Sequence, residues 1–220
     1  MAAARGPRTV DASLQESSLD GRRLRAAKNR DAVVTAVLQI IRERNGTPLP
    51  GAAEVAKRAK VSERTVFRHF ADLDSLFFAA ASQQRPVVAA ALRPRPDSPE
   101  LDRRIATICR LRSRLYEEVA PVRRVATRLA TDNKTLASMM EEAHAASRVQ
   151  LAETFQPELG RATGARRSLL LDELDALTTW RMWEILRTQQ GLTVERSRKV
   201  VADLMSILLK PLEVAPNRRR

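Results

Sequence analysis

Hydrophobic residues recur every three or four positions along most of the chain, and no stretch alternates in the manner of a β-strand. The first clear stripe joins Val33, Val37 and Ile40, between Asn29, a helix-capping residue, and the sequence Asn45-Gly46. We therefore predict a helix from Asn29 to that glycine. The whole pattern predicts an all-α protein with about nine helices.

Residues 55–70, VAKRAKVSERTVFRHF, predict two short amphipathic helices with a tight joint between them. Val55 and Ala56 face inward in the first helix. Ser62 can accept a hydrogen bond from the amides that open the second helix, in which Val66 and Phe70 form a buried pair four residues apart. This arrangement is typical of a helix-turn-helix.

The outward-facing residues of this stretch are of the types that contact DNA. A helix of this width enters the major groove, where arginine can bind guanine and hydroxyl groups can reach phosphates. We predict a base contact from Arg64 and phosphate contacts from Thr65 and His69. The full predicted DNA-binding set is Lys60, Ser62, Glu63, Arg64, Thr65, Phe67, Arg68 and His69. On spacing alone, a solvated helical hairpin explains the pattern equally well.

The rest of the chain predicts further helices. A fourth helix is capped by Asp72 or Asp74 and continues to about Leu92, and the three prolines of residues 93–99 then interrupt the pattern. The later predicted helices are 101–119, 122–130, 135–155, 167–190 and 194–212.

From residue 30 to residue 76 the chain resembles the DNA-binding domain of the tetracycline-repressor (TetR/AcrR) family of bacterial transcriptional regulators. The residues that carry the resemblance are Arg30-Asp31-Ala32-Val33, Arg44-Asn45-Gly46, Val55-Ala56, Ala59, Val61-Ser62, Thr65, Arg68-His69-Phe70 and Asp74-Ser75-Leu76. The chain departs from the family pattern at a few positions. Lys60 replaces the turn glycine, Phe67 a tyrosine and Leu73 a lysine.

The resemblance implies that different segments of the chain have different functions. We expect a DNA-binding domain at 29–74, a helical ligand-binding and dimerisation domain at 75–215 and a basic tail at 216–220. Residues 1–28 have no sustained apolar stripe, so we expect a flexible basic arm there. The resemblance carries functional expectations too. It also implies a homodimer that represses transcription from a palindromic operator and is released by a small-molecule effector. Repression and activation are not distinguished by the residues themselves.

The last two predicted helices have wide apolar faces, which favours burial against a second copy of the chain. In the family, dimers form mainly through these two helices of each subunit. The predicted interface residues are Leu174, Leu177, Val201, Leu204 and Leu208.

Sulfur-containing, aromatic and histidine side chains in the C-terminal half could line a pocket between helices. Core packing explains each of them as well. The candidate pocket residues are Cys109, Met139, Met140, His144, Trp180 and Trp183. The sequence does not identify the effector.

The charge of the chain favours a polyanionic partner. The formal net charge is +13 over 220 residues. Residues 22–70 hold twelve Lys and Arg against four Asp and Glu, a net of +8. Phe67 has no hydroxyl and Leu73 no charge, so neither can make the phosphate contact that the resemblance would supply. The arm residues Arg22, Arg23, Arg25 and Lys28 are candidates to replace these contacts. A solubilising segment explains their charges equally well.

A single cysteine, Cys109, excludes an intrachain disulfide and favours a reducing compartment. No apolar run approaches the ~20 residues that span a bilayer, and residues 1–20 lack the apolar segment of a secretory signal. We therefore predict a cytoplasmic protein.

The sequence gives little support for the hypothesis that the protein is an enzyme. Glu141 and His144 have the spacing of a di-iron bundle motif, but such a site needs that motif twice, and the only other histidine is His69. No nucleotide-binding glycine pattern or nucleophile with a base occurs. We predict no catalytic residue, metal or cofactor. The alternatives are a nonspecific nucleoid-type DNA-binding protein and, less favoured, a helical-bundle metal enzyme.

Overall fold

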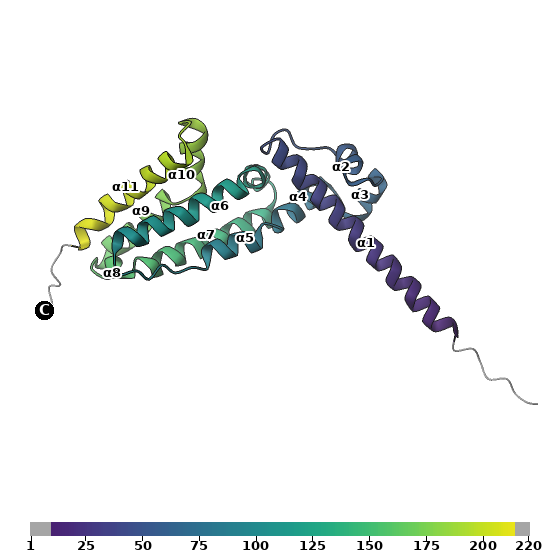
Figure 1. Cartoon of the computed structure of the whole chain (residues 1–220), viewed down its shortest axis with the longest axis horizontal. Helices are drawn as coiled ribbons and strands as arrows, with labels where there is room; N and C mark the ends of the chain where they lie inside the picture. Colours follow the sequence, from purple (N-terminus) through teal and green to yellow (C-terminus); the bar gives the residue numbers. More distant parts are fainter. Residues whose placement is uncertain (1–9, 214–220) are drawn as a thin grey trace, which may run out of the picture. The chain divides into compact units, whose positions relative to one another are not determined.

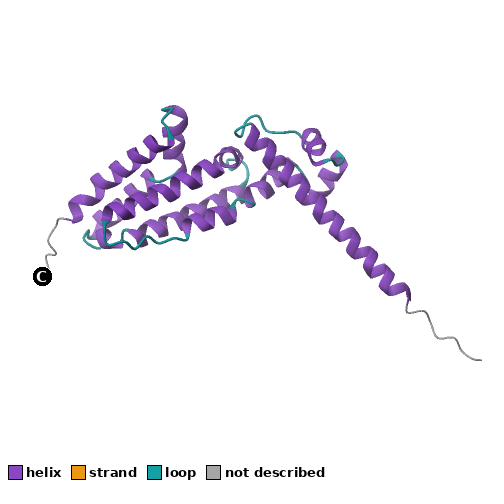
Figure 2. Ribbon diagram, in the orientation of Figure 1, coloured by secondary structure: helices purple, strands orange, loops and turns teal. Residues whose placement is uncertain are grey.

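The computed structural model describes the backbone of residues 10–213 and the side chains of residues 23–210, and every regular element between residues 10 and 213 is a helix (Figures 1 and 2). The chain divides into two compact units, one ending at Ala80 and the other beginning at Ala81. The boundary expected after Asp74 lies inside helix α4 (Leu73–Ser82). The all-α prediction is confirmed.

The first unit is built on the long helix α1 (Val10–Glu43), which ends as the sequence predicts. Asn45 and Gly46 have positive φ values of 52° and 92°. The amide of Gly46 donates to the carbonyl of Ile41 at 2.8 Å, which satisfies one of the last helical carbonyls.

Helix α1 begins far earlier than expected, since the segment 1–28 was predicted to be a flexible arm and is helical from Val10 onward. Residues 10–28 contain no proline and are rich in leucine, alanine and long charged side chains, which favour a helix without requiring a packed face. The lack of an apolar stripe in residues 10–28 therefore indicates that this segment is not buried, but it does not indicate that the segment is not helical. Leu24 is 73% exposed, in keeping with that lack of a partner. Residues 1–9 lie outside the described part of the chain.

Three short helices complete the first unit: α2 (Ala52–Ala59), α3 (Glu63–His69) and the start of α4. Asp72 and Ser75 form reciprocal hydrogen bonds at the start of α4, with Ser75 N donating to Asp72 Oδ1 at 2.7 Å, so Asp72 is the cap. Helix α1 packs against α2 and α3. The buried core of this unit includes Val33, Val37, Ile40, Ile41, Val55, Val66, Phe70 and Leu76.

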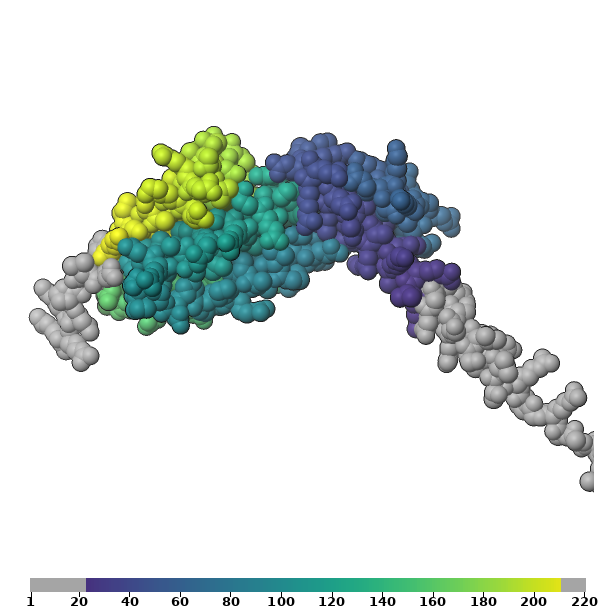
Figure 3. Space-filling view, in the orientation of Figure 1, coloured from purple at the N-terminus to yellow at the C-terminus, as the bar shows by residue number. Residues whose placement is uncertain are grey.

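The second unit is a bundle around the long helix α6 (Leu101–Leu129), which packs against its neighbours α5, α7, α10 and α11 (Figure 1). The remaining elements are α5 (Arg85–Leu92), α7 (Lys134–Thr154), α8 (Gln156–Leu159), α9 (Gly164–Leu177), α10 (Trp180–Glu184), the π-helix η1 (Ile185–Gln189) and α11 (Val194–Glu213). In Figure 3, α11 forms part of the surface of this unit beside α6.

Several predicted boundaries differ from the structure. Pro121 was predicted to separate two helices but lies inside α6. Proline removes one helical hydrogen bond, and the buried stripe that continues on both sides of Pro121 outweighs that loss. Conversely, the segment 167–190 is divided at Thr178. The predicted fourth helix is also divided, because the separate helix α5 begins at Arg85 with Pro86 in its first turn, where no amide donor is needed.

The inner face of α6 is a regular seam with alternating steps of four and three residues. Its eight members are all buried: Leu101, Ile105, Ile108, Arg112, Leu115, Val119, Val122 and Ala126. Seven of them are apolar, and Arg112 is the exception. Its first three members pack into a core whose other members include Leu151, Phe155, Leu170 and Met205, and Leu115 and Val119 pack with Leu92 in a second cluster. Within the described residues, no helix is long and apolar enough to cross a membrane.

Candidate DNA-binding surface and ligand cavity

The joint between α2 and α3 is fixed by backbone and side-chain hydrogen bonds. Lys60 adopts the left-handed conformation, with φ 56° and ψ 42°, and the amide of Val61 donates to the carbonyl of Ala56 at 3.0 Å. Ser62 Oγ then accepts from the amide of Thr65 at 3.1 Å and lies 2.9 Å from Thr65 Oγ1. Ser62 is therefore the cap of α3, as the sequence predicts.

Burial of Val66 and Phe70 determines which face of α3 points outward. These two residues are 1% and 4% exposed. Arg64, Phe67 and Arg68 lie on the opposite side at helical spacing, and all three are exposed. Phe67 is 48% exposed between the two arginines, a position from which an aromatic ring can contact a thymine methyl group.

The remaining predicted residues flank this face. Lys60, Ser62 and Glu63 are exposed, whereas Thr65 and His69 are half-buried. The hydroxyl of Thr65 already bonds to Ser62, which limits its reach towards a phosphate. Burial lowers the pKa of His69, helped by the nearby charges of Arg68 and Arg30.

The basic side chains of the first unit fall into two groups. Arg58 pairs with Glu43 at 2.7 Å, and Arg44 pairs with Glu54, so these arginines hold α1 to α2. Among the described side chains, Lys60, Arg64 and Arg68 have no carboxylate partner. Lys57, exposed in the last turn of α2, belongs to the same group, although it is not among the residues predicted from the sequence to contact DNA. A net positive surface therefore surrounds α3.

The four basic residues predicted as arm contacts lie on α1. Arg23, Arg25 and Lys28 are exposed, and the side chain of Arg22 lies outside the described ones. Arg25 and Lys28 are three residues apart, so they share one face of the helix.

The second unit contains two adjoining cavities beside α6. The larger, which we name the central cavity, has a volume of about 720 Å³ and lies among α5, α6, α7, α9 and α10. The smaller, the side cavity, has a volume of about 400 Å³ and lies between α5, α6 and α7. Val88, Leu92, Val119, Arg123, Met140 and Ala143 line both. Both volumes suit a small organic molecule.

Four of the six predicted pocket residues lie at these cavities. Met139 lines the side cavity, Met140 both, and His144 and Trp180 the central cavity. Cys109 and Trp183 line neither of these cavities, but both line a much smaller pocket of about 10 Å³, so the candidate set stays a prediction. The Cys109 thiol lies 3.8 Å from Met205 Sδ in the core, and Trp183 Nε1 donates to Glu117 Oε1 at 2.9 Å.

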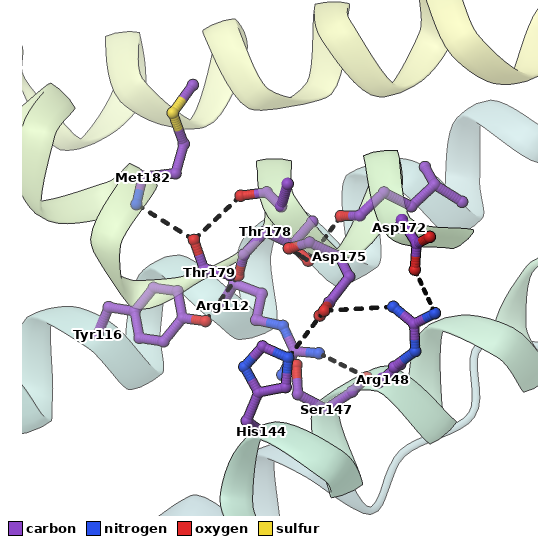
Figure 4. Close-up of polar contacts among 12 residues, drawn as sticks. Arg112, Tyr116, His144, Ser147, Arg148, Asp172, Asp175, Thr178, Thr179 and Met182 are labelled. Atoms are coloured by element: carbon purple, nitrogen blue, oxygen red, sulfur yellow. Dashed lines mark hydrogen bonds and ion pairs between the residues drawn. The ribbon is translucent and has the colours of Figure 1, made fainter. Parts of the chain in front are cut away.

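A polar cluster forms one end of the central cavity (Figure 4). His144 Nε2 lies 2.8 Å from Asp175 Oδ2, and Arg148 Nη1 donates to the same oxygen at 3.5 Å. Tyr116 donates its hydroxyl to the carbonyl of Thr178 at 2.6 Å. Within the described residues, no group of three or more His, Cys, Asp or Glu side chains could hold a metal ion, and His144 is engaged by Asp175.

The predicted dimer residues are not equivalent in the structure. Leu174 and Val201 are 0% and 6% exposed in the core of their own chain, so they offer little or no surface to a second copy. Leu177 and Leu208 pack at the edge of that core. Leu204 is half-buried, and its neighbour Ile207 on α11 is 68% exposed.

A short helix-turn-helix unit followed by a helical bundle with internal cavities is the architecture that the resemblance implied. A scan against protein-family models and a search of curated proteins each found no match. Solved structures are similar. One is a TetR-family transcriptional regulator from Streptomyces coelicolor, with a TM-score of 0.64 and 18% identity over 86% of this chain and 92% of that one.

A second similar structure is a protein from Mesorhizobium loti assigned to the same family. Its TM-score is 0.60 and its identity 20%, over 85% of this chain and 98% of that one. The chain therefore has the fold of TetR-family regulators, which confirms the resemblance at the level of the fold.

Proposed function

We propose that this protein is a sequence-specific DNA-binding transcriptional regulator that binds a palindromic operator as a homodimer. The observation that carries the proposal is the outward face of α3. Arg64, Phe67 and Arg68 project from a capped and well-anchored helix, with no carboxylate partner for either arginine among the described side chains. The likeness in fold to TetR-family regulators supports the same function.

The proposed mechanism is repression relieved by a small molecule. Two copies of α3 would enter successive major grooves about 34 Å apart, and a ligand in the second unit would change their separation. The cavities beside α6 support this step, because they offer volumes of about 720 and 400 Å³ for such a ligand.

Selection of bound DNA from a random pool tests the function directly. A regulator should enrich one sequence with two related half-sites. Enrichment of no sequence, together with tight but salt-sensitive binding to any duplex, would favour the nonspecific nucleoid-type alternative.

The proposed dimer can be tested on α11. Leu204→Asp combined with Ile207→Asp places two charges on the apolar face that the core leaves uncovered, and sedimentation should then show monomers. Ser206→Asp, on a neighbouring face of the same helix, is the control and should remain dimeric. A folded double variant that remains dimeric would place the interface elsewhere.

The basic start of α1 is a further proposed contact. Each phosphate neutralised contributes about −0.9 to the slope of log affinity against log salt, so two contacts from each subunit amount to roughly 3 to 4 units. Deletion of residues 1–28 should therefore make the slope of log affinity against log salt shallower by that amount. An unchanged slope and affinity in a folded, dimeric truncation would show that Arg23, Arg25 and Lys28 make no DNA contact.

A further inference from the structure

Arg112 occupies a position on α6 that the helix otherwise reserves for apolar side chains. It lies in the buried seam between Ile108 and Leu115, and it is only 4% exposed. A buried guanidinium is stable only when carboxylates or several oxygens compensate for its lost hydration. Arg112 therefore needs a partner.

The chain supplies very little compensation. Nη2 of Arg112 donates one long hydrogen bond, 3.3 Å, to the carbonyl of Ser147, and the buried Nε has no partner. Among the described side chains, no carboxylate lies within 4.0 Å of Arg112. Burial lowers the pKa of this guanidinium, as expected of a charge that is poorly compensated.

The nearest acidic neighbour is already occupied. Asp175 accepts from Arg148 and lies in hydrogen-bond contact with His144, and Figure 4 shows these two partners together with Arg112. Arg148 also bonds to Asp172. Asp175, the buried carboxylate that lines this end of the central cavity, is thus already engaged by Arg148 and His144.

Arg104, a buried arginine elsewhere on the same helix, does have a carboxylate partner, although its Nε, like that of Arg112, is buried without a hydrogen-bond partner. Arg104 is as deeply buried as Arg112, and it pairs with the buried Glu158 and donates to two backbone carbonyls. Arg104, which does not line the central cavity, therefore has a carboxylate partner, whereas Arg112, which lines it, has none among the described side chains.

A second arginine, Arg123, also lines the central cavity without a carboxylate partner among the described side chains. Arg123 lies eleven residues after Arg112, which returns to the same face of the helix about 16 Å further along. It lines both cavities, and its Nε is buried without a partner. The walls around it are largely apolar and include Val88, Leu92 and Met140, while the exposed Glu141 also lines the central cavity.

From this geometry we infer that the central cavity binds an organic anion, a carboxylate with an apolar body, whose acidic group is held by Arg112 while Arg123 adds a second positive charge along the cavity. The apolar body lies against the leucine, valine and methionine walls. A bidentate carboxylate would supply the partner that the guanidinium lacks. This inference deepens the proposed function, because it names the chemical class of the effector.

The test measures binding to the full-length protein by calorimetry, without DNA, so that its outcome is independent of the proposed DNA-binding function. The probes are octanoate and 1-naphthoate, each compared with its uncharged analogue, 1-octanol or 1-naphthol. At least one carboxylate should bind ten or more times as tightly as its alcohol. The inference is overturned if neither carboxylate binds more tightly than its alcohol.

Variants assign the acidic group to its partner. Arg112→Met should weaken binding of the carboxylate roughly 10- to 100-fold, the loss expected of a charged hydrogen bond, and should leave binding of the alcohol unchanged. Arg123→Met should have a smaller effect in the same direction. Arg114→Met, an exposed arginine on the same helix, is the matched control and should have none.

Thermal melting of the ligand-free variants separates this role from a structural one. Arg112→Met removes a poorly compensated buried charge and keeps an apolar side chain in the seam, so its melting temperature should equal or exceed that of the unaltered protein. A large fall in melting temperature with unchanged carboxylate affinity would make Arg112 a structural residue and overturn the inference. Arg112→Lys, which keeps the charge, should retain part of the preference for the carboxylate.

Discussion

The buried ion pair between Arg104 and Glu158 offers a quantitative test of how the second unit is held together. It joins the first turn of α6 to α8, and the two side chains are 4% and 2% exposed. Nη1 of Arg104 also donates to the carbonyls of Ser98 and Pro99, at 2.6 and 3.0 Å. The pair therefore fixes the proline-rich segment that precedes α6 as well.

Glu158→Gln removes the negative charge while preserving the shape of the side chain. Removal of one partner from a buried pair typically costs about 3–5 kcal/mol, because the other charge remains buried. We expect about 3 kcal/mol, the lower end, since the amide oxygen of glutamine can still accept one hydrogen bond from Arg104. For a domain of this size that corresponds to a fall of roughly 6–12 °C in melting temperature.

The assay is urea unfolding followed by far-ultraviolet circular dichroism, with two comparison variants. Glu153→Gln breaks a surface pair with Arg95, whose side chains are 53% and 39% exposed, and should change stability by no more than about 1 kcal/mol. Arg104→Met combined with Glu158→Met removes both charges and should recover most of the loss. If Glu158→Gln were as mild as Glu153→Gln, the pair would not be desolvated and our reasoning on buried arginines would be refuted.

Three further predictions follow from individual side chains. Lys60→Gly should stabilise the first unit by about 0.5–1 kcal/mol in urea unfolding, because glycine adopts the positive φ of 56° without strain; a destabilised variant would contradict the left-handed turn. The pKa of His69 is lowered from 6.5, chiefly by burial, so the folded state resists protonation and stability should fall as the pH drops below 6.5; His69→Gln should flatten this dependence, and an unchanged slope would refute the assignment. Burial raises the pKa of Cys109 to about 12, so its thiol should react with a disulfide reagent at pH 8 only after unfolding, and rapid labelling of the native protein would contradict its place in the core.

Local signals explain why the helix-turn-helix could be predicted from the sequence. Ser62 can cap only the helix that follows it, and Val66 and Phe70 leave a single choice of inner face. Such signals act within one or two turns, so tertiary packing does not alter them. The turn at Lys60 was placed through the family resemblance, in which Lys60 stands at the turn glycine, and the structure has Lys60 in the left-handed conformation.

The second unit was less predictable because its boundaries and cavities depend on packing between distant segments. Pro121 was read as a separator, yet the apolar seam on both sides of it holds one continuous helix. Cys109 and Trp183 have the chemistry of pocket residues, but the arrangement of neighbouring helices places them at a pocket of about 10 Å³ and not at the central cavity. Arg112 could have been found, since its position in the four-and-three spacing of α6 is visible in the sequence.

The central claim is that α3 reads bases through Arg64, and the most direct test combines a protein variant with DNA variants. Affinities of the unaltered protein and of Arg64→Ala are measured for the selected operator and for duplexes changed at one base pair of each half-site. Arg64→Ala should cost about 1–3 kcal/mol on the operator and should lose its discrimination at one position only. Equal weakening on every duplex, or no preferred sequence for the unaltered protein, would contradict the account.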